Sequence, residues 1–248
     1  MNLETRLKRR ALDWSLPLPF NCRHREYSVI SSVDDECSQP NERLLDLALK
    51  AIQHARQTDL SWISRRMANP PFYPDIWPGE HYKLLSSLVS VLQPRKVIEI
   101  GTFQGLSALA IKGSLPSGAQ LTTVDIKPWA EIENTVFRPS DFEDGSLFQV
   151  IGDLSNRSFF EEFSPALSSC DLLFVDAPKN IIFESTFLKF LESIPLPPAA
   201  VVLFDDIRQW NMLKIWREIS RPKIDLTSFG HWTGTGMIDW NGCAAKLV

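Results

Sequence analysis

Two stretches of this chain place acidic residues where buried strands are expected to end. Leu172–Asp176 finishes in one carboxylate, and Val201–Phe204 runs directly into Asp205 and Asp206. Because neighbouring parallel strands open their carboxyl ends onto one crevice, we expect these three carboxylates to lie close together. Two like charges about 4 Å apart repel by roughly 4 kcal/mol at an effective dielectric of about 20. A divalent cation such as Mg²⁺ would offset that repulsion, so Asp176, Asp205 and Asp206 are the predicted metal ligands.

An interpretation without metal is open for the same residues. Asp205 or Asp206 could cap a helix that begins at Ile207, and Asp176 could pair with Lys179. A helix cap needs only one carboxylate, however, whereas three converge here. The pattern therefore favours a cation site.

A glycine turn lies upstream of these acids. Residues 97–105 read Val-Ile-Glu-Ile-Gly-Thr-Phe-Gln-Gly, and residues 106–111 continue with helical character. This order predicts a buried strand, a tight turn and a helix, the first unit of a doubly wound sheet. The turn is Gly-x-x-x-Gly, not the Gly-x-Gly-x-x-Gly that cradles a dinucleotide pyrophosphate. With Glu99 beside it, the turn suits a positively charged nucleoside without phosphates, such as S-adenosylmethionine; close packing is the alternative explanation of the glycines.

A second acidic strand end supports a nucleoside ligand. Residues 121–126 read Leu-Thr-Thr-Val-Asp-Ile and place Asp125 about twenty residues beyond the glycine turn. In doubly wound folds a carboxylate at this position accepts hydrogen bonds from ribose hydroxyls. The alternative is that Asp125 caps a turn at Lys127 and Pro128.

Length and composition fit one α/β domain with an extension. The chain has 248 residues and a formal net charge of −4, so nucleic acid is not the expected partner. The longest apolar stretch, near residues 199–204, is too short for a membrane span, and residues 1–20 lack the apolar core of a signal peptide. The cysteines form no Cys-x-x-Cys pair and are expected to be free thiols: Cys22, Cys37, Cys170 and Cys243. We expect a cytoplasmic protein with no membrane partner, and a homodimer is left open.

Periodic patterns supply the remaining elements. Further strands are predicted at Leu147–Ile151, Ile224–Ser228 and Gly236–Trp240, the last two as a pair. Helices are predicted at Asn41–Arg56, at His81–Leu92 and directly after Asp206. The buried face of the first helix is predicted to carry Leu45, Leu49, Ile52 and Ala55.

The predicted fold is therefore α/β: a doubly wound, mostly parallel seven-stranded sheet with an N-terminal helical extension. Residues 1–78 are expected to form an irregular arm, a helix and a proline-rich loop that covers the site. Residues 79–248 are expected to form the cofactor-binding catalytic domain. Four prolines within residues 69–79 exclude a regular element there and predict a loop.

The run from Glu80 to Asp206 resembles the cation-dependent O-methyltransferases, which include catechol and caffeoyl-coenzyme-A O-methyltransferases and bacterial sugar and antibiotic enzymes. The shared motifs are Glu-Ile-Gly-x-x-x-Gly-x-Ser at 99–107, the acidic end at Asp125, Asp-x-x-Lys at 176–179, and the pair Asp205-Asp206. The resemblance implies a Rossmann-like fold. It also implies methyl transfer from S-adenosyl-L-methionine to a hydroxyl of a small molecule, with Mg²⁺ or another divalent cation.

The resemblance further implies roles for individual residues. The cofactor would contact Glu99, Gly101, Thr102, Gly105, Ser107, Asp125, Asp153 and Asp176. Asp176, Asp205 and Asp206 would hold the metal, and Lys179 would take the proton of the acceptor. Two positions depart from the plant and animal pattern: Asp206 stands where Asn is usual, and Ile182 stands where Tyr is usual.

Other residues and other functions stay open. His231, in the glycine-rich stretch 229–236, is a rival catalytic base, and Tyr73 and Trp77 of the proline loop are candidates for a lid. A metal-independent N- or O-methyltransferase of the same fold would use the acids to bind an amine. A nicotinamide-dependent oxidoreductase is disfavoured because residues 101–106 lack its glycine motif. A catalytically silent scaffold would bind neither S-adenosylmethionine nor metal.

Overall fold

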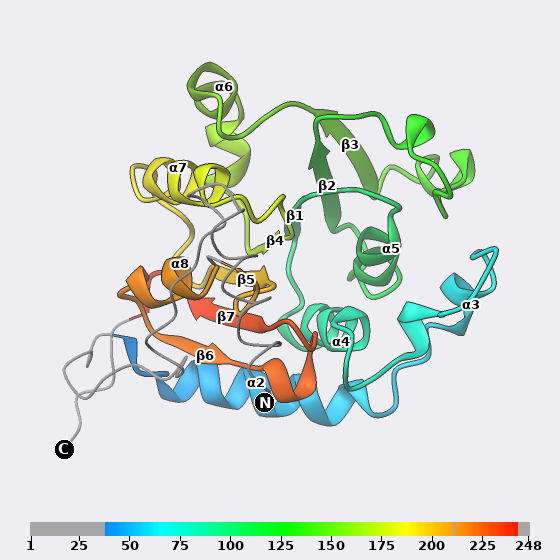
Figure 1. Cartoon of the computed structure of the whole chain (residues 1–248), viewed down its shortest axis with the longest axis horizontal. Helices are drawn as coiled ribbons and strands as arrows, with labels where there is room; N and C mark the ends of the chain where they lie inside the picture. The colour runs from blue at the N-terminus through cyan, green and yellow to red at the C-terminus, as the bar shows by residue number, and fades with distance from the viewer. Residues whose placement is uncertain (1–37, 211, 243–248) are drawn as a thin grey trace, which may run out of the picture.

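The computed structural model describes residues 38–210 and 212–242, which form a seven-stranded sheet with helices on both faces (Figure 1). The order across the sheet is β3-β2-β1-β4-β5-β7-β6, and β7 runs antiparallel to both neighbours while all other pairs are parallel. The strands are β1 (Lys96–Ile100), β2 (Gln120–Asp125), β3 (Leu147–Ile151), β4 (Leu172–Val175), β5 (Val201–Asp205), β6 (Lys223–Asp225) and β7 (Thr235–Asp239). The predicted doubly wound, mostly parallel seven-stranded sheet is confirmed.

Helices cover the two faces of the sheet in separate groups (Figure 1). One group is α2 (Glu42–Ala55), α4 (Tyr82–Leu92) and α5 (Leu106–Lys112), with the short α3 (Ser61–Ser64) beside it. The other is α6 (Arg157–Leu167), α7 (Ile182–Leu191) and α8 (Met212–Glu218). Single 3₁₀ turns lie at Tyr73–Asp75, Trp129–Glu131, Pro139–Asp141 and Thr227–Phe229.

The alternation of side chains along β5 decides where its terminal acid points. Val201 and Leu203 belong to the core under α2, α4 and α5, whereas Val202 and Phe204 belong to the core under α6, α7 and α8. Successive side chains of a strand face opposite sides of the sheet. Asp205, the last residue of the strand, therefore faces the layer that contains α4.

The helix predicted directly after Asp206 begins later than expected. The backbone N–H groups of Ile207 and Arg208 donate to the carbonyl oxygens of Gly234 and Thr233, and α8 starts only at Met212. Pairing with the chain before β7 thus replaces the first helical turn. The interpretation of Asp205 or Asp206 as a cap of a helix at Ile207 is wrong for this reason.

The buried face of α2 agrees only in part with the predicted one. Ala55 is buried and Ile52 packs against the core, as predicted. Leu45 and Leu49 are exposed, and Leu44, Leu47 and Ala48 are buried instead. Two apolar stripes overlap in this helix, and the one that fits against α4 becomes the core face. The sequence pattern alone does not distinguish them.

The predicted last strand pair exists with shifted ends. Strand β6 ends at Asp225, because the Asp225 carboxylate accepts from the backbone N–H of Thr227 at 2.8 Å and the chain turns there. Ser228 therefore lies in a 3₁₀ turn and not in the predicted strand Ile224–Ser228.

Several expectations concern residues outside the described ranges. The predicted irregular arm lies mostly within residues 1–37, and Cys22, Cys37 and Cys243 are also outside. Cys170 is a buried free thiol, as expected. Among the described residues, no helix has the length and apolar character needed to cross a membrane. The division of the chain into residues 1–78 and 79–248 stays a prediction.

Gly101, after β1, is required by packing against the end of β4. Its φ is +100°, and a Cβ at this position would overlap the carbonyl oxygen of Asp176. The Gly101 N–H donates to the carbonyl oxygen of Val124 at 2.8 Å. The turn therefore links three neighbouring strand ends.

Replacing Gly101 by Ala should destabilise the fold more than replacing Gly118, which has φ +78° and open space around it. Gly118→Ala should cost about 1 kcal/mol through the left-handed backbone alone. Gly101→Ala should cost about 1–3 kcal/mol more, because the new methyl group also displaces the chain at Asp176. Urea unfolding of both variants measures the difference. Equal losses would contradict the close approach.

Candidate active site

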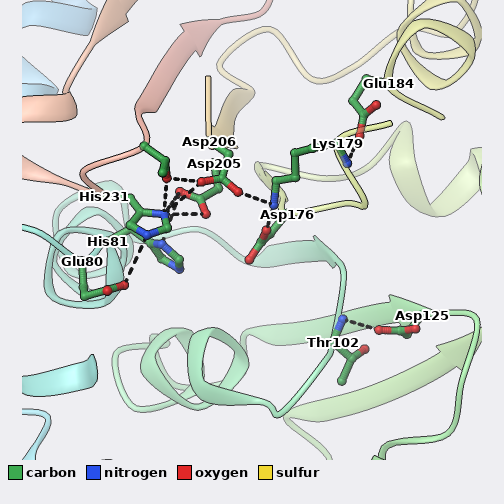
Figure 2. Close-up of polar contacts among 11 residues, drawn as sticks. Glu80, His81, Thr102, Asp125, Asp176, Lys179, Glu184, Asp205, Asp206 and His231 are labelled. Atoms are coloured by element: carbon green, nitrogen blue, oxygen red, sulfur yellow. Dashed lines mark hydrogen bonds and ion pairs between the residues drawn. The ribbon is translucent and has the colours of Figure 1, made fainter. Parts of the chain in front are cut away.

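Carboxylates and cations meet at the carboxyl ends of β4 and β5 (Figure 2). Asp176 follows β4, Asp205 ends β5, and Asp206 adopts a left-handed backbone with φ 60°. The Lys179 ammonium is in direct contact with Asp176, and its Nζ lies 3.0 Å from Asp206 Oδ2. The predicted pairing of Asp176 with Lys179 is thus present, and the lysine lies between two of the predicted metal ligands.

The charge of Lys179 follows from its surroundings. Burial alone would lower its pKa, but the carboxylates of Asp176, Asp205 and Asp206 outweigh burial and raise the pKa above its usual value. Glu184 holds the loop that carries this lysine: the Lys179 backbone N–H donates to Oε1 of buried Glu184 at 2.7 Å. In this arrangement Lys179 is a cation, and its role as a base stays a prediction.

His231 contacts Asp205 and Asp206 on the side away from Lys179 (Figure 2). Its Nδ1 is 3.1 Å from Asp205 Oδ2 and 3.2 Å from Asp206 Oδ1, and its Nε2 is 3.7 Å from Glu80 Oε2. Burial alone would lower its pKa, but the hydrogen bonds to Asp205 and Asp206 raise the pKa to about 10. The ring is therefore protonated at neutral pH here, and its role as a base also stays a prediction.

A second histidine approaches Asp205 from the start of α4. His81 is 3% exposed, and its Nδ1 lies 3.3 Å from Asp205 Oδ1 without hydrogen-bond geometry. Its ring packs beside Phe174 and His231, at centroid distances of 5.3 and 5.5 Å. Burial would raise the pKa of Asp205, but the two histidines keep it below its usual value.

Two adjoining cavities open beside this cluster. One, of about 640 Å³, is lined by Asp125, Asp153 and Lys179 among others. The other, of about 350 Å³, is lined by Thr102, Gly105, Ser107, Glu80, His231, Tyr73 and Trp232 among others. Gly101, Phe103 and Asp176 line both. Most of the residues predicted to contact a cofactor therefore line one or both of these neighbouring cavities.

Asp125 has backbone partners in the glycine turn. Its Oδ2 accepts from the N–H groups of Thr102 and Phe103 at 2.9 and 3.1 Å, and its Oδ1 accepts from Lys127 at 3.2 Å. The carboxylate therefore fixes both turns and borders the larger cavity. Asp153 borders the same cavity and accepts from the backbone N–H of Ser155 at 2.8 Å. Contact of either residue with a cofactor stays a prediction.

Glu99 lies outside both cavities. Its carboxylate is fully buried and accepts from Thr123 Oγ1 at 2.6 Å. Burial raises its pKa to about 8, although hydrogen bonds from Ser107 and Thr123 act in the opposite direction. Contact of Glu99 with a cofactor also stays a prediction.

The proline loop is joined to the connection between β6 and β7. Trp77 Nε1 donates to the carbonyl oxygen of Phe229 at 2.7 Å. Gly79 donates to Gly230 and accepts from the N–H of Trp232, both at 3.0 Å. The two segments form one cover beside the smaller cavity, to which the loop contributes Tyr73. Trp77 acts as a tether in this cover and does not line either cavity.

Several site residues were not identified from the sequence. Glu80, His81, Glu184 and Thr233 all contact the cluster. The one available signal was the Glu80-His81 pair, two ionisable residues directly before an amphipathic helix. Its partner His231 is 150 positions away in the chain, a separation that no local pattern reveals.

Three sets of side chains among the described residues have ligand atoms within 4.8 Å of one another. They are Glu80, His81 and His231; His81, Asp176 and Asp205; and Asp205, Asp206 and His231. Each set contains a histidine. The predicted set of Asp176, Asp205 and Asp206 is interrupted by Lys179, and metal binding by these three carboxylates stays a prediction.

The sheet order, the glycine turn and the acidic strand ends define a Rossmann-like methyltransferase fold. A sequence model of the family described as O-methyltransferase matches residues 65–194. The chain belongs to this O-methyltransferase family, and the resemblance stated from its motifs is confirmed.

The matches to individual relatives cover half of this chain. The chain is 32% identical over 134 residues to catechol O-methyltransferase B of Danio rerio, covering 50% of this chain and 46% of the relative. It is 30% identical over 128 residues to a transmembrane O-methyltransferase of Homo sapiens, covering 50% and 43%. The chain thus matches about half the length of these curated relatives.

A solved structure supports the fold. The O-methyltransferase from Bacillus cereus in complex with SAH superposes with a TM-score of 0.51 at 17% identity, over 76% of this chain and 88% of that one. At this level of identity the similarity concerns the fold alone.

The raised pKa of Glu99 predicts a pH-dependent stability. The folded state keeps a proton that the unfolded chain releases above its ordinary pKa of 4.5. The stabilisation is full below that value and is lost as the pH rises through about 8. Glu99→Gln should therefore lose less stability than the wild type between about pH 5 and about pH 9.

Urea unfolding at the two pH values tests this prediction. Glu162→Gln is the matched control, because that carboxylate is exposed on α6. The control should follow the wild type. If Glu99→Gln also follows the wild type, the buried carboxyl does not hold its proton.

Proposed function

We propose that this protein transfers a methyl group from S-adenosylmethionine to a hydroxyl of a small molecule, with the help of a divalent cation. The observation that carries the proposal is the meeting of two cavities at Gly101 and Asp176, directly beside the charged cluster. A cofactor in one cavity and an acceptor in the other would face each other across this junction. Membership in the O-methyltransferase family supports the same reaction.

The larger cavity fits the cofactor. It has space for a nucleoside and brings together Gly101, Asp125 and Asp153 from three successive strand ends. Asp125 would accept hydrogen bonds from ribose hydroxyls, and it is already oriented by two backbone N–H groups. S-adenosylmethionine would supply an electrophilic methyl group on its sulfonium.

The cluster also fits a divalent cation. Both ring nitrogens of His81 are buried without a hydrogen-bond partner, beside the carboxylates of Asp176 and Asp205. Oxygen and imidazole donors of this kind are metal ligands. A cation held by the cluster would orient the acceptor hydroxyl and make it more acidic.

The protein's own residues would position the acceptor and move its proton. Tyr73 and Trp232 flank the smaller cavity and would bind an apolar or aromatic body. A phenol has an ordinary pKa of about 10, so transfer at neutral pH needs a proton acceptor. Lys179 contacts Asp176, which borders both cavities. It would take the acceptor's proton in its neutral form, after its carboxylate contacts weaken and its own proton passes to solvent.

A metal-independent methyltransferase is the second candidate, and one observation favours it. Lys179, His81 and His231 face Asp176, Asp205 and Asp206, so the cluster can balance its charge without metal. In that case the acids would hold an amine or hydroxyl acceptor directly. Sensitivity to chelator separates the two candidates.

The cytoplasmic location, the absence of membrane and nucleic-acid partners and a homodimeric state stay predictions. The binding space supports a small molecule as the methyl acceptor.

Calorimetry with S-adenosylhomocysteine tests the proposed cofactor. Wild-type protein should bind it, and Asp125→Ala should weaken binding by about 1–3 kcal/mol through lost hydrogen bonds. With a catechol as a trial acceptor, EDTA should abolish methyl transfer, and added divalent cation should restore it. Transfer that survives exhaustive chelation favours the metal-independent candidate, and no binding of the nucleoside contradicts both.

Lys179→Ala tests the proton acceptor. If Lys179 is the base, kcat should fall by about 10²–10⁴-fold with little change in affinity for S-adenosylhomocysteine. Higher pH should partly restore kcat, because the acceptor then ionises without a base. If Lys179 only balances the carboxylates, added Mg²⁺ and not higher pH should restore activity.

A further inference from the structure

We propose that Glu80, His81 and His231 form a binding site for a divalent transition metal, with Asp205 orienting both histidines. This site differs from the three carboxylates predicted from the sequence. The inference deepens the proposed function. Only the role of the metal in methyl transfer rests on that function, because metal binding itself is measured separately.

Asp205 lies between the two imidazole rings. Its Oδ1 is 3.3 Å from Nδ1 of His81, and its Oδ2 is 3.1 Å from Nδ1 of His231. Asp205 is only 2% exposed and is fixed at the end of β5. A carboxylate at one ring nitrogen is the usual second partner of a metal-binding histidine, since it sets the orientation of the ring and leaves the other nitrogen for the metal.

The opposite side of each ring has no strong partner of its own. Nε2 of His81 is buried without any hydrogen-bond partner, and Nε2 of His231 lies 3.7 Å from Glu80 Oε2. Glu80, His81 and His231 each offer a ligand atom within 4.8 Å of the other two. Figure 2 shows the two rings together, with Glu80 beside them and the aspartates beyond.

The neighbouring carboxylates already have a cation. Lys179 contacts Asp176 and lies 3.0 Å from Asp206, whereas both ring nitrogens of the buried His81 have no hydrogen-bond partner. A metal at the histidines would keep the lysine contacts intact. A metal between Asp176 and Asp206 would have to displace them.

The donor set decides the class of metal. Two imidazoles and one carboxylate suit Zn²⁺, Co²⁺ or Fe²⁺ and leave coordination positions open, whereas Mg²⁺ prefers oxygen ligands only. Glu80 and His231 border the cavity of about 350 Å³, so the open positions would face an acceptor there.

Titration of the metal-free full chain with Co²⁺, followed by its visible absorption, tests the site. Co²⁺ and Zn²⁺ should bind on the order of 100-fold more tightly than Mg²⁺. His81→Gln and His231→Gln should each lower Co²⁺ affinity by at least about tenfold, and Asp205→Asn by about 10–100-fold. His54→Gln, an exposed histidine on α2, is the control and should bind like the wild type.

Asp176→Asn separates this site from the carboxylate site. It should change Co²⁺ affinity by less than about threefold if the histidines are ligands, because a group outside the ligand set has little effect. Unchanged Co²⁺ affinity in both histidine variants overturns the proposal. So does loss of Co²⁺ binding in Asp176→Asn together with retention in His81→Gln.

A measurement on the wild type covers the case in which a buried variant does not fold. With ¹⁵N-labelled histidine, Zn²⁺ should shift the ring-nitrogen signals of His81 and His231 and leave that of His54 in place; unshifted His81 and His231 signals overturn the site. Metal binding without methyl transfer would contradict the proposed function and support the site. Chelator-sensitive transfer with unchanged metal affinity in the histidine variants would support the proposed function and contradict the histidine site.

Discussion

The burial of Asp205 is the constraint on which the arrangement of this site depends. A carboxylate that is 2% exposed at the end of a central strand is costly unless cations or donors surround it. The protein supplies imidazoles from two distant segments, the start of α4 and the connection before β7. The positions of α4 and of the β6–β7 connection are thus tied to the same buried charge.

The strand ends were predictable because their signals are local. Parallel strands buried on both faces appear as short apolar runs, and an acid at the end of such a run marks the edge where ligands bind. Asp176 and Asp205 follow this pattern, Asp125 ends a strand with two threonines, and the sheet order brings all three to one side. For the same reason the glycine turn was identified with its strand and helix.

The remaining features depend on contacts that a local pattern does not contain. The start of α8 is set by pairing of Ile207 with Gly234, and the face of α2 is set by its fit against α4. His81 belongs to the site only because the start of α4 lies beside the end of β5, which brings its ring close to Asp205. Gly101 was identified as a special position from its own turn, but its close approach to the chain at Asp176 joins two strand ends that are far apart in the sequence.

The cover over the smaller cavity has an evolutionary consequence. Gly79 joins Gly230 and Trp232 through main-chain groups, and Trp77 adds one side-chain bond to Phe229, so the side chains of Tyr73 and Trp232 take no part in holding the cover. Exposed side chains such as Tyr73 and Trp232 can therefore be exchanged without opening the cover. Descendants of one ancestral sequence can in this way differ in the side chains that line the cavity while inheriting the same main-chain connection beside it.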